Sequence, residues 1–435
     1  MLSGDRAGCT PQFTGFVLTN DIWTTILAGH MDPAVTQLRP PPYLEALADY
    51  LKTQEPETWA WFDSTQAQSD YADSLRLDLL KQTYRLDAAA YPDLFLALEE
   101  AKSRLGLTIP ITLYQSQRNR ELNAALFFLP GEAHIVFEGD VLRLLDPAEL
   151  RSVLGHELAH YVLWSGSERR FFVADRIMQA MAHESRAEPS HVESARLMRL
   201  YTEIFADRGA LQVTGNPTAV VSGLIKMQTG LSQVDAASYV RQAEEVFARS
   251  KVRTEELSHP EAFIRARATM LWADNSEEME SEVTRMIEGA PILDKLDLVG
   301  QQRMTRLTRT WLQAYLQPDW FRTDAVRGHA RLFFPEFEFE TDEAAKIDLL
   351  AELQDAGNTI RDYFCYVMLD FSAVDPDLEL EPLRAAFRLA GELGWDARLE
   401  TMAVKELKLK KAEVKKLRSE VLAHEPDSET KEEVS

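Results

Sequence analysis

The sequence predicts a mainly helical α+β protein, in which a domain with a small sheet and a buried central helix precedes an all-α domain. Three observations support this class. Residues 155–160 read GHELAH inside a stripe of buried helical spacing. Short runs rich in apolar and β-branched residues occupy residues 109–137, ahead of that helix. Residues 343 to about 422 read as four or so helices.

Composition and charge limit the classes of partner. The chain has 435 residues, of which 45% are hydrophobic and 27% charged, so it can bury a full core in two or three domains. A net charge of −23 argues against nucleic acid and against an anionic membrane surface as partners. With two cysteines, no secretory signal and no apolar run long enough for a transmembrane segment, we expect a cytoplasmic protein.

Changes in composition divide the chain into five predicted parts. A proline run at Arg39–Pro42 closes the first part as a stiff linker, and the acidic run Glu277–Glu282 suggests a domain edge. The parts are an irregular segment 1–42, a metal-site domain 43–280, a helical connector 281–342, a C-terminal helical domain 343–423 and a disordered tail 424–435.

Helices and then strands are expected ahead of the GHELAH stretch. Residues 43–105 read as helices, with clear spacing at 43–51 and 91–105. Strands are expected at 109–114, 124–128 and 134–137, and Pro130-Gly131 between the last two indicates a hairpin. An exposed edge strand of such a sheet can hold an extended peptide by backbone hydrogen bonds.

The metal-binding helix has clear start and stop signals. Asp146 is an N-cap candidate, Pro147 suits the first helical position, and Glu149 completes a capping box, while Ser165-Gly166 is a plausible end. His156 and His160 lie one turn apart on one face, where both imidazoles can bind one zinc ion. Glu157 lies near enough to take a proton from a metal-bound water.

A later helix supplies the candidate third ligand. It is expected to open with a capping box at Ser190–Glu193 and to end before Gly215. We predict that Glu203 binds the metal and that Asp207, one turn on, orients a ligand histidine. The alternative is a pair of surface carboxylates on an amphipathic helix. The apolar neighbours of Glu203 and the need for a third ligand favour the first interpretation.

One further segment carries candidate catalytic residues. His259 lies in Ser258-His259-Pro260 at a predicted helix start, and Arg265 follows it. Either side chain could stabilise the oxyanion that forms when water attacks a carbonyl. His259 could instead be a temporary fourth zinc ligand that closes the site. The alternative is a helix-capping histidine and a surface arginine.

Taken together, these motifs resemble the gluzincin metallopeptidases that include the CAAX prenyl proteases and the heat-shock protease HtpX. The resemblance rests on HExxH at 156–160, Glu203 with Asp207, and the Ser-His-Pro segment with Arg265, and it covers roughly residues 45–275. Asn123-Ala124 looks like the family's element on the substrate-binding edge. The resemblance implies a zincin-like domain, one Zn²⁺ per chain and peptide substrates. Many relatives are membrane-embedded or exported, and the lack of such signals here puts membrane-protein substrates in doubt.

The C-terminal part carries weaker signals. Residues 370–395 look similar to TerB-like helical domains, and their acidic loop could bind a divalent cation or simply cap the next helix. Residues 405–422 read as one amphipathic helix with a charged outer face. Residues 333–340 alternate aromatic and acidic residues, as expected for a linker, an edge strand or a docking segment. A protein partner could bind this domain.

Two classes of function follow from these residues. The first is a soluble zinc-dependent metalloendopeptidase, in which Glu157 activates a zinc-bound water and then protonates the leaving amine, with His259 and Arg265 supporting the oxyanion. The second is a binding or chaperone-like protein whose zinc site is closed or silent and which acts through its C-terminal helical domain. A zinc hydrolase that acts on something other than peptides is a third interpretation.

Overall fold

The computed structural model describes residues 38–117, 121–184, 186–249, 253–255, 258–340, 343–354 and 356–423, without the side chains of residues 65–71. The predicted irregular segment 1–42 lies mostly outside the described residues, and the tail 424–435 lies wholly outside them. The described chain forms two compact units. Unit 1 contains Asp63–Phe172 and Arg199–Ile287, and unit 2 contains Pro42–Phe62, Val173–Met198 and residues 288–423.

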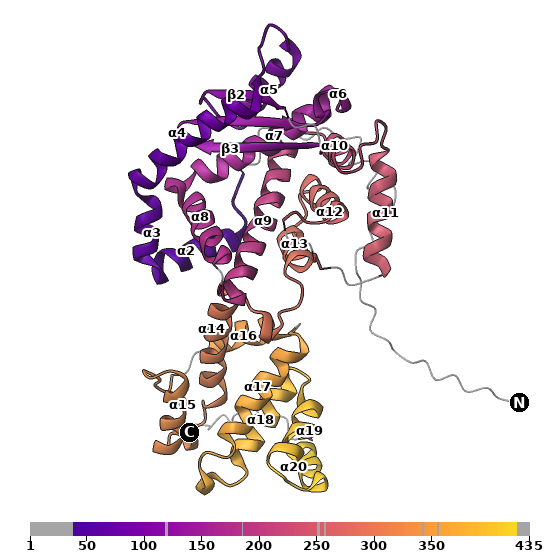
Figure 1. Ribbon diagram of the computed structural model, residues 1–435. Helices are drawn as coiled ribbons and strands as arrows, with labels where there is room; N and C mark the ends of the chain where they lie inside the picture. The colour runs from indigo at the N-terminus through magenta and orange to yellow at the C-terminus, as the bar shows by residue number, and fades with distance from the viewer. Residues whose placement is uncertain are drawn as a thin grey trace, which may run out of the picture. The chain divides into compact units, whose positions relative to one another are not determined.

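Unit 1 contains a four-stranded sheet in the order β1-β2-β4-β3 (Figure 1). β1 (Thr83–Arg85) pairs antiparallel with β2 (Ile111–Ser116), β2 pairs parallel with β4 (Glu132–Glu138), and β3 (Asn123–Leu129) pairs antiparallel with β4. The predicted hairpin between β3 and β4 is confirmed, and Gly131 adopts the left-handed conformation at its turn, with φ of 84°. β3 is therefore an edge strand of the sheet.

Helices cover both faces of this sheet. α4 (Thr65–Gln82) packs Leu75 and Leu79 against Tyr114 and Val136 on one face. α5 (Pro92–Arg104) and α7 (Pro147–Ser165) pack against the other face, where the short helix α6 (Val141–Leu144) also joins the core. Because strand side chains alternate between faces, α4 and α7 contact different residues of the same strands.

The rest of unit 1 is helical. α9 (Pro189–Thr214), of which unit 1 holds the part from Arg199 onward, is followed by α10 (Pro217–Thr229), α11 (Ala236–Arg249), α12 (Ala262–Ala273) and α13 (Met279–Ile287). α10, α11 and α12 share an apolar core that includes Val221, Val240 and Ala266. α10 also contacts α7, because buried Glu149 accepts hydrogen bonds from Ser222 (2.5 Å) and Lys226 (2.8 Å).

Unit 2 contains only helices and turns among its described residues. Its helices are α2 (Pro42–Gln54), most of α3 (Pro56–Asp63), most of α8 (Arg170–His183), the start of α9, α14 (Leu298–Tyr315), α15 (Asp324–Phe333), α16 (Glu343–Leu353), α17 (Asn358–Phe371), α18 (Glu381–Glu392), α19 (Asp396–Glu406) and α20 (Lys411–Ala423). The core of its C-terminal part is rich in aromatic side chains, with Trp311 and Trp395 stacked at 5.8 Å between ring centroids.

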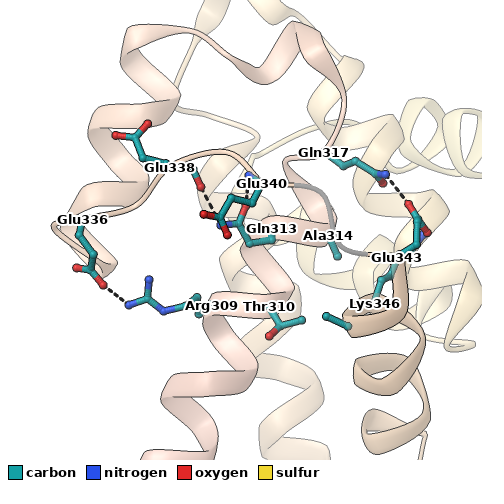
Figure 2. Close-up of a pocket in the computed structure, with 11 residues that line it drawn as sticks. Arg309, Thr310, Gln313, Ala314, Gln317, Glu336, Glu338, Glu340, Glu343 and Lys346 are labelled. Carbon is teal, nitrogen blue, oxygen red and sulfur yellow. Dashed lines mark hydrogen bonds and ion pairs between the residues drawn. The ribbon is translucent and has the colours of Figure 1, made fainter.

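A charged cavity of about 320 Å³ lies in unit 2 between α14, residues 336–340 and α16 (Figure 2). Its side chains are largely engaged with one another. Glu336 pairs with Arg309, and Gln317 donates a hydrogen bond of 2.5 Å to Glu343. Gln313 bonds to the backbone at both Glu338 and Glu340, which holds the segment in place.

The predicted mainly helical α+β class is confirmed, whereas two local expectations needed correction. The helices expected over 43–105 are interrupted by β1, which is only three residues long. The single helix expected over 405–422 is two helices, because Lys408 adopts a positive φ of 54° between them. The segment 333–340 forms no strand and buries Phe337 in the core of unit 2, as a linker would. None of the helices in the described ranges combines the length and apolarity that a bilayer crossing requires.

Candidate metal centre

The GHELAH stretch lies in the middle of α7, as predicted. Asp146 caps this helix, accepting hydrogen bonds from the backbone of Ala148 and Glu149, and the Glu149 side chain accepts one from the backbone of Asp146. The predicted capping box is therefore confirmed. Burial of Glu157 and His160 in this helix holds the candidate metal-binding side chains on a rigid element.

α7 and α9 cross at small residues, which lets the second helix approach the first closely. A Cβ placed on Gly209 of α9 would lie 2.3 Å from the Cβ of Ala159 on α7. A Cβ on Gly155 would lie 2.8 Å from the Cβ of Val213. Side chains cannot overlap at such distances, so the crossing requires glycine at both positions. This close crossing brings Glu203 of α9 over the histidines of α7.

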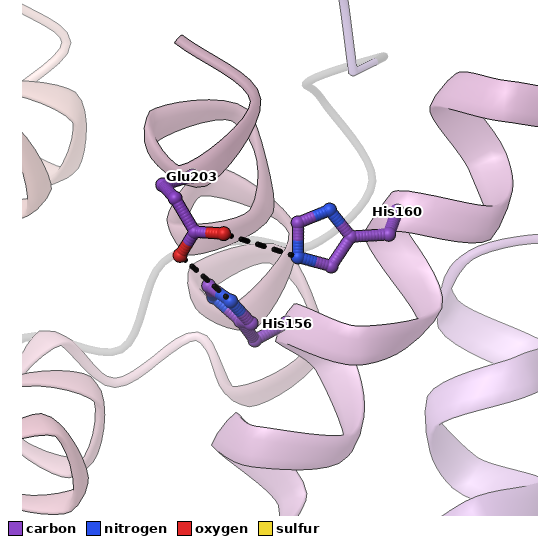
Figure 3. A group of neighbouring side chains, drawn as sticks. All are labelled: His156, His160 and Glu203. Carbon is purple, nitrogen blue, oxygen red and sulfur yellow. Dashed lines mark ion pairs between the residues drawn. The ribbon is translucent and has the colours of Figure 1, made fainter. Parts of the chain in front are cut away.

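Three donor groups converge at this crossing (Figure 3). Nε2 of His156 lies 3.4 Å from Oε2 of Glu203, and Nε2 of His160 lies 3.7 Å from its Oε1. Ligands bound to zinc at 2.0–2.1 Å in a tetrahedron are about 3.4 Å apart, so these separations match a shared ion. Glu203 Oε2 is buried and has no hydrogen-bond partner in the described part of the chain. A two-histidine, one-carboxylate set with such an atom fits a zinc ion.

Asp207 and Arg265 support the first of these ligands from behind. Asp207 Oδ1 lies 3.0 Å from Nδ1 of His156, the ring nitrogen opposite the converging one. Arg265 of α12 donates two hydrogen bonds to the Asp207 carboxylate, at 2.6 and 2.7 Å. This bidentate pair is buried and holds the carboxylate in one orientation. The structure thus brings together His156, Asp207 and Arg265. The sequence predicted that Asp207 orients a ligand histidine, but not that Arg265 bonds to Asp207.

The charges of the site shift the pKa values of the two histidines in opposite directions. Burial lowers the pKa of His156, but the carboxylates of Asp207 and Glu203 outweigh it and raise that pKa to about 10. Burial lowers the pKa of His160 to about 4, although Glu203 opposes the shift. Burial raises the pKa of Glu203, but the interactions with His156 and His160 outweigh it, so the pKa is lowered and the carboxylate stays ionised.

Glu157 is the buried carboxyl group beside the three donors. Burial raises the pKa of Glu157 to about 7, with Glu203 adding to the shift and His156 opposing it. An interaction with the backbone amide of Leu126, on β3, also lowers this pKa. The Glu157 side chain therefore extends from α7 towards the edge strand, and its pKa is close to the value that suits a general base at neutral pH.

His259 and the pair Asn123-Ala124 lie at the outer parts of the site. Nε2 of His259 is 3.6 Å from Oε2 of Glu203, and 58% of the His259 side chain is exposed. Asn123 and Ala124 begin β3, the edge strand whose Leu126 faces Glu157. The structure thus places His259 beside the candidate ligand Glu203, and Asn123 and Ala124 at one end of the strand nearest the site.

Sequence reasoning missed one residue beside the candidate metal. The Trp164 ring stacks on the ring of His160, at 5.4 Å between centroids and 25° between planes. Nδ1 of His160 has no hydrogen-bond partner among the described residues, unlike Nδ1 of His156. The spacing of Trp164, one turn after His160 on the same helix face, is the signal that could have identified it.

Comparison with known proteins supports an assignment for this part of the chain. Residues 96–273 match the model of peptidase family M48. Over 177 residues the chain is 27% identical to "Protease HtpX homolog" from Pseudarthrobacter chlorophenolicus, a match that covers 35% of this chain and 60% of that relative. Over 203 residues it is 29% identical to "Plastoglobule-localized metallopeptidase 48, chloroplastic" from Arabidopsis thaliana, covering 42% of this chain and 58% of that relative.

These matches support an M48-type zinc metallopeptidase domain. The matched segment contains β2, β3, β4, α7 and α9 with Glu203, and it ends with α12, which carries Arg265. The chain spans about 60% of the length of the curated relatives that it matches. No solved structure matches the chain. The resemblance to CAAX prenyl proteases in particular, and that of residues 370–395 to TerB-like domains, stay predictions.

Proposed function

We propose that this chain is a zinc-dependent metalloendopeptidase that hydrolyses peptide bonds with Glu157 as its general base. The observation that carries the proposal is the convergence of three zinc-binding groups beside a buried carboxyl group. His156, His160 and Glu203 would hold one zinc ion per chain, and Glu157 follows His156 directly on the same helix. The match to an M48 peptidase supports this chemistry.

The proposed mechanism divides the work among a few side chains. A bound zinc ion supplies a Lewis acid that lowers the pKa of a water molecule towards about 7. Glu157, with its pKa raised to about 7, accepts a proton from the attacking water and then donates it to the leaving amine. His259 lies at the exposed side of Glu203 and donates a hydrogen bond to the developing oxyanion.

In this proposal Arg265 positions another side chain, whereas the sequence predicted that it supports the oxyanion. Both of its hydrogen bonds at 2.6 and 2.7 Å go to Asp207, and its Nη1 remains 3.8 Å from Glu203. This geometry supports a positioning role: Arg265 holds Asp207, and Asp207 holds the His156 ring. A direct contact between Arg265 and the oxyanion stays a prediction.

The substrate would be an extended peptide or an unfolded protein segment. β3 is at the edge of the sheet, and an added peptide strand can pair with its backbone. Asn123 and Ala124, which begin β3, would contact one end of the bound peptide. Such a strand would pass the part of α7 that carries Glu157, because Leu126 packs against the core that contains Leu154 and Leu158. A cytoplasmic location and a protein partner for the C-terminal helices stay predictions.

Replacement of Glu157 by glutamine tests the proposal. Glu157→Gln keeps the size of the side chain but cannot accept the proton, so we expect cleavage of casein to fall by about 10²–10⁴-fold with the zinc content unchanged. Glu149→Gln is the matched control, since Glu149 is equally buried on the same helix but binds Ser222 and Lys226. Full turnover in Glu157→Gln, or a folded protein without zinc, would contradict the proposal.

The proximity of His259 to Glu203 is also compatible with the second hypothesis, a binding or chaperone-like protein with a closed zinc site, although the family matches do not favour it. A separation of 3.6 Å between His259 Nε2 and Glu203 Oε2 would let His259 take a fourth position on the same ion. His259→Ala distinguishes the two roles in the casein assay. Cleavage should rise if His259 closes the site, and fall if His259 supports the oxyanion.

A further inference from the structure

Three aromatic side chains form a continuous surface next to His160, which we call the aromatic wall: Trp164 of α7, Phe172 of α8 and Phe128 of β3. Phe128 and Phe172 lie 4.7 Å apart between ring centroids, and Trp164 lies 6.1 Å from Phe128 and 6.5 Å from Phe172. Phe128 is buried, whereas Trp164 and Phe172 are half-buried. The aromatic wall therefore presents exposed ring surface beside a candidate metal ligand.

The aromatic wall lies farther along the same path that a peptide on β3 would follow. Leu126 packs against the core that contains Leu154 and Leu158, on either side of Glu157 in α7, and Phe128 comes two residues later, which is about 7 Å along a strand. Phe128 contacts Tyr161 and Trp164, which follow Glu157 in that order on α7. β3 and α7 thus run in the same direction here, from the reactive centre towards the aromatic wall.

The backbone of β3 determines which substrate residue would reach the aromatic wall. β4 pairs with one edge of β3, so an added peptide would pair with the other edge, along Leu126 to Phe128. Antiparallel pairing is the more stable arrangement for an added strand. In an antiparallel peptide, the residues before the scissile bond lie towards Phe128. Side chains directly opposite each other on paired strands share a face of the sheet. One of the peptide residues before the scissile bond would therefore place its side chain on the same face as Phe128.

We infer that the aromatic wall is a substrate subsite for an aromatic side chain that lies one or two residues before the scissile bond. This inference rests on the proposed peptidase function. Aromatic rings pack on one another in tilted and edge-to-face geometries, and the exposed faces of Trp164 and Phe172 would lose contact with water when such a ring binds. A small or charged side chain at that place would gain neither contact.

The test compares two fluorogenic peptides that differ only in carrying Phe or Ala at both of the two residues before the scissile bond. We expect wild-type protein to cleave the Phe peptide with a kcat/KM at least about tenfold higher. Phe172→Ala should remove most of this preference, because kcat/KM should fall for the Phe peptide and stay unchanged for the Ala peptide. Phe172 is the chosen position because α8 carries none of the candidate metal ligands, so zinc content should stay the same.

A matched control lies on the same strand. Phe127 points to the opposite face of β3, where it packs near Leu75 and Leu79, so Phe127→Ala should keep the preference for Phe. Binding of the two peptides to zinc-loaded Glu157→Gln, measured by calorimetry, gives a readout without turnover, and there too the Phe peptide should bind about tenfold more tightly.

The outcomes separate the subsite from the peptidase itself. Casein cleavage with equal rates for both peptides would overturn the subsite and leave the proposed function intact. Cleavage with an aromatic residue after the scissile bond, identified by mass spectrometry of the products, would also overturn it. If neither casein nor the peptides are cleaved while Glu157→Gln still binds the Phe peptide preferentially, the peptidase function fails and the aromatic wall remains a binding site.

Discussion

Each unit of the protein buries a polar cluster, and the two clusters differ in how completely their atoms are satisfied. In unit 2, the Asp297 carboxylate accepts hydrogen bonds from Tyr43 (2.7 Å), Ser194 (3.1 Å) and the backbone amides of Val299 and Gly300. In unit 1, the buried Oε2 of Glu203 accepts no hydrogen bond within the described residues, and the nearest ring nitrogen is 3.4 Å away.

This difference distinguishes a structural cluster from a candidate ligand site. The Asp297 cluster joins three segments that are far apart in sequence and caps α14, so every donor has an acceptor without any ligand. The cluster at Glu203 gathers donor atoms that face one another at the spacing of metal ligands. A buried polar atom without a partner costs free energy unless something binds it, so the second cluster gains stability when a cation is present.

An isolated unpartnered group shows that burial alone does not make a site. His134 of β4 is 5% exposed, and neither ring nitrogen has a hydrogen-bond partner among the side chains that the structure describes. Its nearest charged neighbour, Glu132, is 3.7 Å away, and Tyr114 packs beside the ring. Within the described ranges, no third metal-binding group joins His134 and Glu132. Convergence of several donors is therefore what distinguishes the centre at Glu203.

The largest expected effect comes from removing the unsatisfied carboxylate. Glu203→Gln should weaken zinc binding by more than about 100-fold, because loss of a residue that merely orients a ligand already costs about 10–100-fold. The free energy of unfolding of the zinc-free protein should change by less than about 1 kcal/mol, since Glu203 Oε2 accepts no hydrogen bond from the described residues and the loss of its interactions with the histidines is offset by the lower cost of burying a neutral amide. Competition titration with a chelator and urea unfolding measure the two quantities. Unchanged zinc affinity would contradict the assignment of Glu203.

The satisfied carboxylate should show the opposite pattern. Asp297→Ala removes a helix cap and leaves the Tyr43 and Ser194 hydroxyls without this acceptor, so we expect a loss of about 2–3 kcal/mol in the free energy of unfolding. Zinc affinity of the folded protein should not change. Asp294→Ala, at an exposed position just ahead of α14, is the control and should stay within about 0.5 kcal/mol of the wild type. Equal losses of unfolding free energy in Asp297→Ala and Asp294→Ala would contradict a structural role of the Asp297 cluster.

The smallest effect is expected at His134 and depends on pH. Burial lowers the pKa of His134 below its ordinary value of 6.5, with Glu132 opposing the shift. The unfolded chain therefore binds more protons than the folded one just below pH 6.5, and wild-type stability falls as the pH drops through this range. His134→Phe should lose this part of the pH dependence. Urea unfolding of both proteins at pH 7.5 and 5.5 gives the difference, and an equal slope would contradict the prediction.

Local features of the fold could be predicted where neighbouring residues decide the conformation. The Asp146 cap, the helix through 156–160 and the turn at Gly131 all follow from residues within a few positions of one another. β1 could not be predicted in this way, because three residues form a strand only when β2 supplies the hydrogen bonds. The break at Lys408 was also missed, since the charge pattern continues across it.

The same limit applies to the candidate site. Spacing on one helix was enough to pair His156 with His160, and Glu203 with Asp207. It was not enough to show that Arg265 would bond to Asp207, which lies on another helix. The place of Trp164 in the aromatic wall could not be predicted either, because its neighbours Phe128 and Phe172 come from β3 and α8.

The sequence by itself determined the donor types, their helical spacing and the position of a general base, because these depend on the period of one helix. Only the tertiary structure decided that the two helices meet. The glycines at 155 and 209 let α7 and α9 approach closely enough for Glu203 to face both histidines. Such convergence depends on packing between segments distant in sequence, and no local pattern in either helix contains that information.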